Sequence, residues 1–77
     1  MEDLLKRITV NPKVMVGKPV IKGTRTTTDL ILELVANGMT LEEIARDYQI
    51  SVDDVKAALL YAAKVIGREE AFVVEKA

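Results

Sequence analysis

GMTLEEIARDYQISVDDVKAAL, residues 38–59, decides the fold of this chain. Two capping signatures, each a hydroxyl residue followed three positions later by an acid, begin at Thr40 and at Ser51. Each stands before apolar residues at helical spacing, which is the pattern of a helix N-terminus. It predicts a short helix that ends near Tyr48 and a longer helix that opens at Ser51. Because only residues 49–50 separate them, we expect a helix-turn-helix.

A further helix precedes this pair. Apolar residues recur four positions apart between residues 27 and 37, where Thr26 is the expected N-cap and Asn37-Gly38 is a strong C-terminal stop. We therefore predict a mainly α fold, a three-helix homeodomain-like helix-turn-helix unit. A short extended or β arm comes before it, and a short C-terminal strand or tail follows it.

The whole chain is expected to form one small domain in three parts. Residues 1–26 read as a basic extended arm or hairpin, because Pro and Gly interrupt short β-branched runs. Residues 27–67 form the helical core. Residues 68–77 form a tail that contains four consecutive apolar residues. The pattern leaves open whether this tail pairs within its own chain or with another chain.

Composition excludes several classes of function. The 77 residues include neither cysteine nor histidine, so the commonest nucleophile, general base and metal ligands are missing. We expect no enzyme activity, no metal and no cofactor. No stretch approaches the roughly 20 apolar residues of a membrane span, and the N-terminus lacks the apolar core of a signal peptide. We expect a cytoplasmic protein that does not interact with membranes.

Charge is distributed unevenly along the chain. Residues 1–28 carry six cationic and two acidic side chains, for +4, whereas residues 29–77 carry five cationic and ten acidic ones, for −5. This split favours a polyanion contact by the N-terminal part. The alternative is that a short basic arm lies over its own acidic body.

The stretch VGKPVIKGTR, residues 16–25, does not match a nucleotide-binding phosphate loop, because the spacing of its glycines and the position of its lysine are wrong. It could still bind one phosphate where it leads into the next helix. Alternatively, Gly23 only supplies a turn and Arg25 pairs with an acid of the body.

The helix expected after Ser51 begins with two acids, Asp53 and Asp54, which would face a polyanion in the usual recognition geometry. We therefore expect any DNA contact to rely on the arm. The candidate nucleic-acid-binding residues are Lys18, Lys22, Arg25, Gln49, Ser51 and Lys56.

The same helix has more apolar residues than one core-facing stripe requires. We expect a second apolar face, formed by Ala57, Ala58, Leu60, Tyr61 and Val65, to serve as a protein interface. A homodimer is the expected state, because a chain of this size buries little surface alone. The candidate interface residues are Leu60, Tyr61, Phe72, Val73 and Val74.

The strings GKPVIKGTR, GMTLEEI and DYQISVDDVKAALLYA, with Asn11-Pro12 ahead of them, resemble the small domain family known as domain of unknown function 433. The likeness runs from about Ile8 to Ala63. It implies a homeodomain-like fold and a role as the antitoxin-like partner of a PIN-like ribonuclease toxin. Thr26-Thr27-Thr28 departs from the family pattern, in which an apolar residue, Pro and Val often follow Gly-Thr-Arg.

Two hypotheses of function follow. The first is a homodimeric helix-turn-helix protein of antitoxin type, which neutralises a PIN-like ribonuclease and binds operator DNA. Acidic side chains would meet the cationic channel of such a partner: Glu42, Asp53, Asp54, Glu69 and Glu70. The second is a protein-interaction or dimerisation module without DNA binding.

Overall fold

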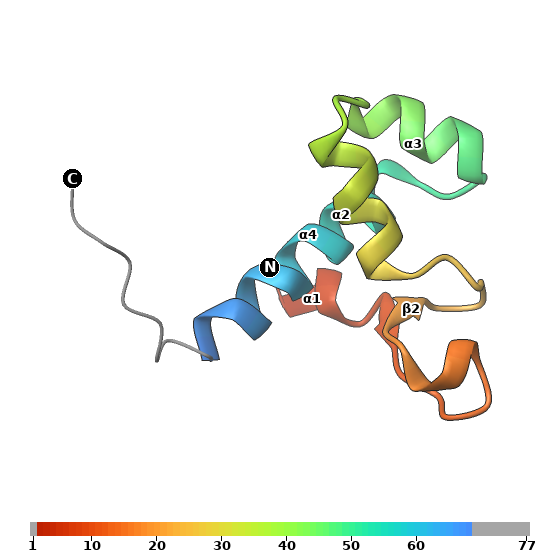
Figure 1. The fold of residues 1–77 in the computed structure, drawn as a ribbon, viewed down its shortest axis with the longest axis vertical. Coiled ribbons are helices and arrows are strands. Elements are labelled where there is room, and N and C mark those ends of the chain that lie inside the picture. Colours follow the sequence, from red (N-terminus) through yellow and green to blue (C-terminus); the bar gives the residue numbers. More distant parts are fainter. Residues whose placement is uncertain (1, 69–77) are drawn as a thin grey trace.

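The computed structural model describes residues 2–68, and this part of the chain is mainly helical with one small antiparallel sheet (Figure 1). The expected tail, with Phe72, Val73 and Val74, lies outside the described residues. No helix in the described part is long and apolar enough to cross a bilayer. The elements in chain order are α1 Glu2–Leu5, β1 Ile8–Thr9, the 3-10 turn η1 Met15–Gly17, β2 Val20–Ile21, α2 Thr28–Ala36, α3 Leu41–Tyr48 and α4 Val52–Arg68.

Both expected capping signatures are formed, which confirms the helix-turn-helix made by α3 and α4. Thr40 Oγ1 accepts a hydrogen bond from the Glu43 N–H at 3.1 Å, and the Glu43 carboxylate accepts one from the Thr40 N–H at 2.8 Å. Ser51 and Asp54 make the same reciprocal pair, with both distances 3.0 Å. Each pair satisfies two backbone N–H donors at a helix start, so these polar residues fix where α3 and α4 begin.

The turn between α3 and α4 depends on a left-handed residue that the sequence pattern does not mark. Gln49 has φ 56° and ψ 43°, and the Ile50 N–H returns to the Ala45 carbonyl at 3.0 Å. This geometry usually falls to glycine, because a side chain in the left-handed region is crowded. Ile50 then packs against the core, where Ala45 is small enough for α3 to approach α4 closely.

Helix α2 begins one residue later than expected. Thr27, not Thr26, is its N-cap, and the Thr27 hydroxyl accepts from the Leu30 N–H at 3.1 Å. The C-terminal stop is as predicted: the Gly38 N–H donates to Val35 O at 3.0 Å, and the next N–H returns to the carbonyl of Leu34. Gly38 has φ 97°, a conformation that glycine adopts without strain. The Asn37-Gly38 pair therefore ends α2 by a Schellman motif.

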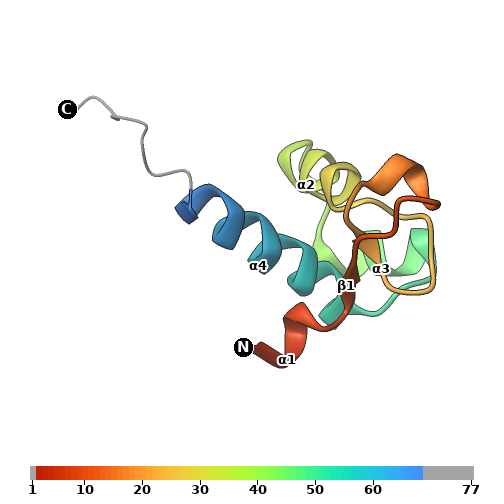
Figure 2. The same cartoon turned by 90° about the horizontal axis from the view of Figure 1, so that it is seen from below.

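The N-terminal part contains a hairpin, as expected, but also a helix that was not expected. Strands β1 and β2 pair antiparallel, with Ile8 opposite Ile21, and both residues of β2 are buried. Helix α1 precedes the hairpin and packs against α4. Figures 1 and 2 show α1 and the hairpin beside the N-terminal half of α4, and Figure 1 shows α3 on the opposite side from them. The arm is therefore part of the folded body.

Helix α4 lies at the centre of this arrangement, in contact with α1, α2, α3 and the hairpin. Its neighbours on two sides explain why one expectation was wrong. Ala57 and Ala58 are both fully buried, whereas the sequence pattern placed them on a free apolar face. The core cluster consists of Ile21, Ile31, Ile44, Ala45, Val55 and Ala58.

The loop between β1 and β2 contains backbone strain. Met15 and Val16 have φ 49° and 56°, and Gly17 follows with φ 79°. A left-handed conformation costs an L-residue about 1–2 kcal/mol, and it is rarer still for a β-branched side chain. Hydrogen bonds hold the loop in this shape, from the Gly17 N–H to Val14 O and from the Lys18 N–H to Met15 O, both 3.1 Å.

Candidate nucleic-acid and partner interfaces

A tight turn after β2 projects two of the candidate cations. The Ile21 N–H donates to Thr26 O at 2.9 Å and closes the turn, while the Thr24 hydroxyl donates back to Ile21 O at 2.8 Å. The Lys22 N–H is tied to the Arg7 carbonyl at 2.7 Å. These hydrogen bonds hold the backbone of the turn in place, so the exposed side chains of Lys22 and Arg25 project from fixed positions.

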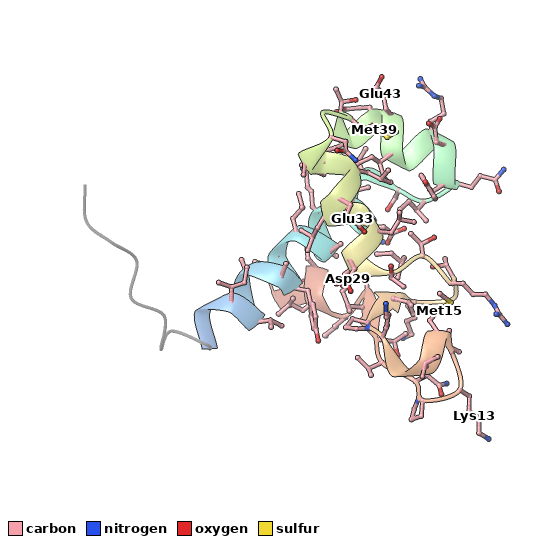
Figure 3. All side chains as sticks on the ribbon, in the orientation of Figure 1. Lys13, Met15, Asp29, Glu33, Met39 and Glu43 are labelled. Carbon is pink, nitrogen blue, oxygen red and sulfur yellow. The ribbon has the colours of Figure 1, made fainter. Side chains whose placement is uncertain are left out.

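A hollow of about 630 Å³ separates this turn from the loop that joins β1 to β2. The loop carries Lys13, whose side chain projects from its outer end in Figure 3, and Lys18. Both views of the ribbon place the loop and the turn at one end of the molecule (Figures 1 and 2). The hollow is lined by Thr9, Asn11, Val14, Val20, Gly23, Thr24 and Arg25.

Positive charge at this end has no local compensation. From Ile8 to Thr28 the sequence has four cationic residues and no acid. Within residues 2–68, Lys18, Lys22 and Arg25 are exposed and form no ion pair. The structure thus places the three arm candidates at one end of the molecule: Arg25 lines the hollow, and Lys18 and Lys22 lie on the loop and the turn that border it. We call this cationic region, from the β1–β2 loop to the turn after β2, the basic end.

Arg7 is the cation that lies over the acidic body. Its Nη1 is 3.1 Å from Asp54 Oδ1, and its Nη2 is 3.9 Å from Asp53 Oδ2. Burial acts to raise the pKa of Asp54, but hydrogen bonds from the Ser51 N–H and from Arg7 outweigh it and hold that pKa below its usual value. Asp54 is therefore ionised at neutral pH and joins the hairpin to the start of α4.

The three candidates outside the arm have different surroundings. Ser51 is exposed, but its hydroxyl and N–H are both engaged with Asp54, so it is committed to capping. Gln49 is exposed in the turn, and both views place this turn at the same end of the molecule as residues 22–26 (Figures 1 and 2). Lys56 is exposed one turn into α4. Gln49 is thus the best placed of the three to extend the basic end.

A second surface lies where the C-terminal half of α4 meets α2. A groove of about 290 Å³ runs between them, mostly with apolar walls. The last turns of α4 extend beyond the rest of the body in both ribbon views (Figures 1 and 2). Ile66 is 69% exposed there because no other described element covers it. The groove is lined by Pro19, Thr28, Asp29, Leu32, Tyr61, Ala62, Val65 and Ile66.

The expected interface residues agree with this groove in part. Tyr61 and Val65 line it and are half-buried. Leu60 is half-buried but does not line the groove. Leu32 and Pro19 line it without having been expected, because their contribution arises only when α2 and the end of the hairpin meet α4.

In the described part of the chain, no cluster of acidic side chains is arranged to hold a metal ion.

Comparison with protein families gives one match. The model of the family described as "Protein of unknown function (DUF433)" matches residues 8–62, which is the segment from β1 into the third turn of α4. It includes the basic end and the helix-turn-helix. Comparisons with curated proteins and with solved structures gave no significant match.

Proposed function

The chain belongs to the DUF433 family of proteins of unknown function, and we propose that it is a non-catalytic helix-turn-helix adaptor of antitoxin type. In this proposal the basic end contacts nucleic acid, and the groove between α2 and α4 receives protein. The observation that carries it is the separation of the two surfaces. Four cations without an acid lie at one end, and an apolar groove with an uncovered Ile66 lies toward the other.

Nucleic-acid binding is proposed for the basic end because its cations are exposed and their backbones are held in place. Each lysine or arginine that neutralises a phosphate releases counterions, so affinity depends steeply on salt. The start of α4 is a poorer candidate surface. Asp53 is exposed there, and Ser51 is committed to its cap. The proposed contact is therefore mainly with the phosphate backbone.

Alanine at Lys18, Lys22 and Arg25 together is expected to weaken DNA binding at least tenfold in 50 mM salt. It should also reduce the slope of log affinity against log salt by roughly 2–3, since each lost phosphate contact contributes about 0.9. Fluorescence anisotropy with a duplex from the chain's own promoter measures both. The matched control replaces Lys6, Arg46 and Lys76, which changes the net charge equally and should leave the slope unchanged. Equal slopes for both triple variants would contradict the proposal.

A second copy of the chain is the proposed occupant of the groove. The last turns of α4 both line the groove and present Ile66 beyond it, so the same patch can serve on both partners of a two-fold interface. Opposite charges are available at its margin, with Asp29 in the lining and Lys64 exposed on α4. Pairing would cover the apolar surface that the described chain leaves uncovered.

Glutamate at Ile66 is expected to convert the dimer to a monomer, because it places a charge against an apolar surface. Light scattering across a concentration series should then give a mass near 8.5 kDa, against twice that for the unaltered chain. Ala63→Glu is the control, since Ala63 is exposed on the same helix and does not line the groove. A mass near 8.5 kDa for the unaltered chain at high concentration would refute the dimer.

The ribonuclease partner is proposed from the family resemblance and from charge. Glu42 and Asp53 are exposed on α3 and α4, although Asp53 also lies 3.9 Å from Arg7. Asp54 is less exposed and is engaged with Arg7 at 3.1 Å, and Glu69 and Glu70 lie outside the described residues. Co-expression with a PIN-like ribonuclease encoded beside the chain should yield a complex. Lysine at both Glu42 and Asp53 should reduce its recovery several-fold. If the double variant forms the complex in full yield, the acidic surface does not contribute to binding the ribonuclease.

An adaptor without DNA binding is the second candidate function. It is favoured by the acidic start of α4, where Asp53 faces solvent and the covering N-terminal segment leaves little of the helix free. Salt-dependent DNA binding, measured as above, separates the two candidates. A chain that dimerises but shows no such binding is an interaction module only.

A further inference from the structure

The left-handed loop Met15–Gly17 combines strain with exposure in a way that core packing does not explain. Val16 has φ 56° and is 94% exposed, and Met15 beside it has φ 49° and is 38% exposed. Strained residues usually persist where the surrounding structure requires them, or where the strain serves binding. Here the Val16 side chain makes few contacts with the body, whereas Met15 is partly covered. The effect of the conformation is to present Val16, together with part of Met15, to solvent.

Hydrogen bonds on the N-terminal side of this loop hold it in the conformation that exposes Val16. The Val14 N–H donates to Asn11 O at 2.9 Å, and the Lys13 N–H donates to the Asn11 side chain at 2.9 Å. Gly17 could not easily be replaced, because its φ of 79° suits glycine. The loop is therefore a fixed projection and not merely a long connection between β1 and β2.

The partner of this projection is expected to be anionic. Lys13 stands two residues before Met15 and Lys18 directly follows Gly17, and no acid occurs between Ile8 and Thr28. Across the hollow, Arg25 faces the same space that Asn11 and Val14 line. An apolar tip with cations on both sides matches the devices by which proteins insert a side chain into a DNA groove while holding the flanking phosphates.

From this arrangement we propose that Met15 and Val16 form an apolar wedge that enters the minor groove of duplex DNA and loosens the base step it contacts. The inference rests on the proposed nucleic-acid function and assigns a specific role to the loop. Duplex DNA is favoured over an anionic membrane because the tip has no aromatic residue and offers only two or three small apolar side chains. Membrane-surface insertion generally needs a larger apolar face, whereas a wedge needs one or two side chains.

The test uses the full chain and a duplex that contains 2-aminopurine, whose fluorescence rises when its stacking is loosened. The unaltered chain should raise the fluorescence. Val16→Ser should abolish most of that rise and weaken binding about tenfold, as expected for losing burial of one apolar side chain, with the salt slope unchanged. Val16→Ile should retain both properties. Ala63→Ser, which alters an exposed apolar residue on α4, away from the basic end, should behave as the unaltered chain.

The possible failures are distinguishable. If Val16→Ser binds and unstacks the duplex as the unaltered chain does, the wedge is wrong and the phosphate contact stands. If the unaltered chain binds no DNA, the wedge and the proposed nucleic-acid function both fall. If Val16→Ser instead loses binding only to vesicles of phosphatidylserine and phosphatidylcholine, the loop is a membrane contact and the wedge is overturned.

Folding of the variants can be checked independently of DNA. Val16→Gly removes the left-handed strain, so its Tm should rise by several degrees above that of the unaltered chain. Val16→Ser should melt no lower than the unaltered chain, because Val16 makes little contact with the body. A large fall in Tm for Val16→Ser would show that the side chain supports the fold, and would overturn its assignment as a free wedge.

Discussion

Replacing Ile31 with alanine is expected to lower the free energy of unfolding by about 2–5 kcal/mol, the usual range for emptying a buried aliphatic site. Ile31 is fully buried on α2 and belongs to the core cluster with Ile21, Ile44 and Val55. A domain of this length has a total stability of roughly 4–12 kcal/mol. The loss is thus a large fraction of the total, and urea unfolding followed by circular dichroism at 222 nm measures it.

The control for Ile31 is the same substitution at Ile66. Ile66 is 69% exposed, so Ile66→Ala should change the stability of the monomer by no more than about 0.5 kcal/mol. Both variants are compared at protein concentrations too low for dimerisation. Equal losses at the two positions would contradict the burial that distinguishes them.

Much of the helical architecture follows from short-range signals in the sequence. The reciprocal Thr40–Glu43 and Ser51–Asp54 pairs predict two helix starts, and both are found at the expected residues. Gly38 predicts the end of α2 in the same way. These signals work because a cap involves residues three or four positions apart, so the physics that decides it is local.

Features that depend on distant contacts were less predictable. A run of three threonines offers more than one N-cap, and the bridge between Val20 and Thr27 selects the second of them. The ion pair between Arg7 and Asp54 joins positions 47 apart in the sequence. No periodicity in residues 1–26 indicates that α1 will pack on α4.

The candidate sites also combine features that are local in the sequence with features that depend on distant contacts. The cations of the basic end were named from the sequence, because exposed charge is readable from composition and turn residues alone. Their placement at one end of the molecule, with Arg25 facing Asn11 and Val14 across one hollow, required the hairpin register. The apolar groove was only partly foreseen: Tyr61 was expected there, but Leu32 comes from another helix. The spacing of apolar residues along one helix cannot show which other element of the fold packs against it.

The covering of α4 by the N-terminal segment changes how its surface is interpreted. In a simple three-helix unit, the second helix of the helix-turn-helix has a face that points away from the core. This face is free to enter a DNA groove. Here α1 and the hairpin contact that helix, and Arg7 holds Asp53 and Asp54 at its start. What remains exposed on its first three turns is Asp53 and Lys56, and Ala63 continues this narrow strip into the fourth turn.

Lysine at Ala57 gives the sharpest test of this covering. Ala57 has no exposed surface, so a lysine there must displace packed neighbours and bring a charge out of water. We expect the free energy of unfolding to fall by more than about 3 kcal/mol, which is a large fraction of the total stability of so small a domain. Circular dichroism and urea unfolding measure the loss.

Ala63→Lys is the matched control, because Ala63 is exposed on the same helix and should accept lysine with a change of no more than about 0.5 kcal/mol. If Ala57 instead lay on a free recognition face, the opposite result would follow. Ala57→Lys would then remain folded, and its added charge would strengthen salt-dependent DNA binding. A folded Ala57→Lys variant with tighter DNA binding would therefore show that α1 leaves α4 in solution and that α4 itself contacts the duplex.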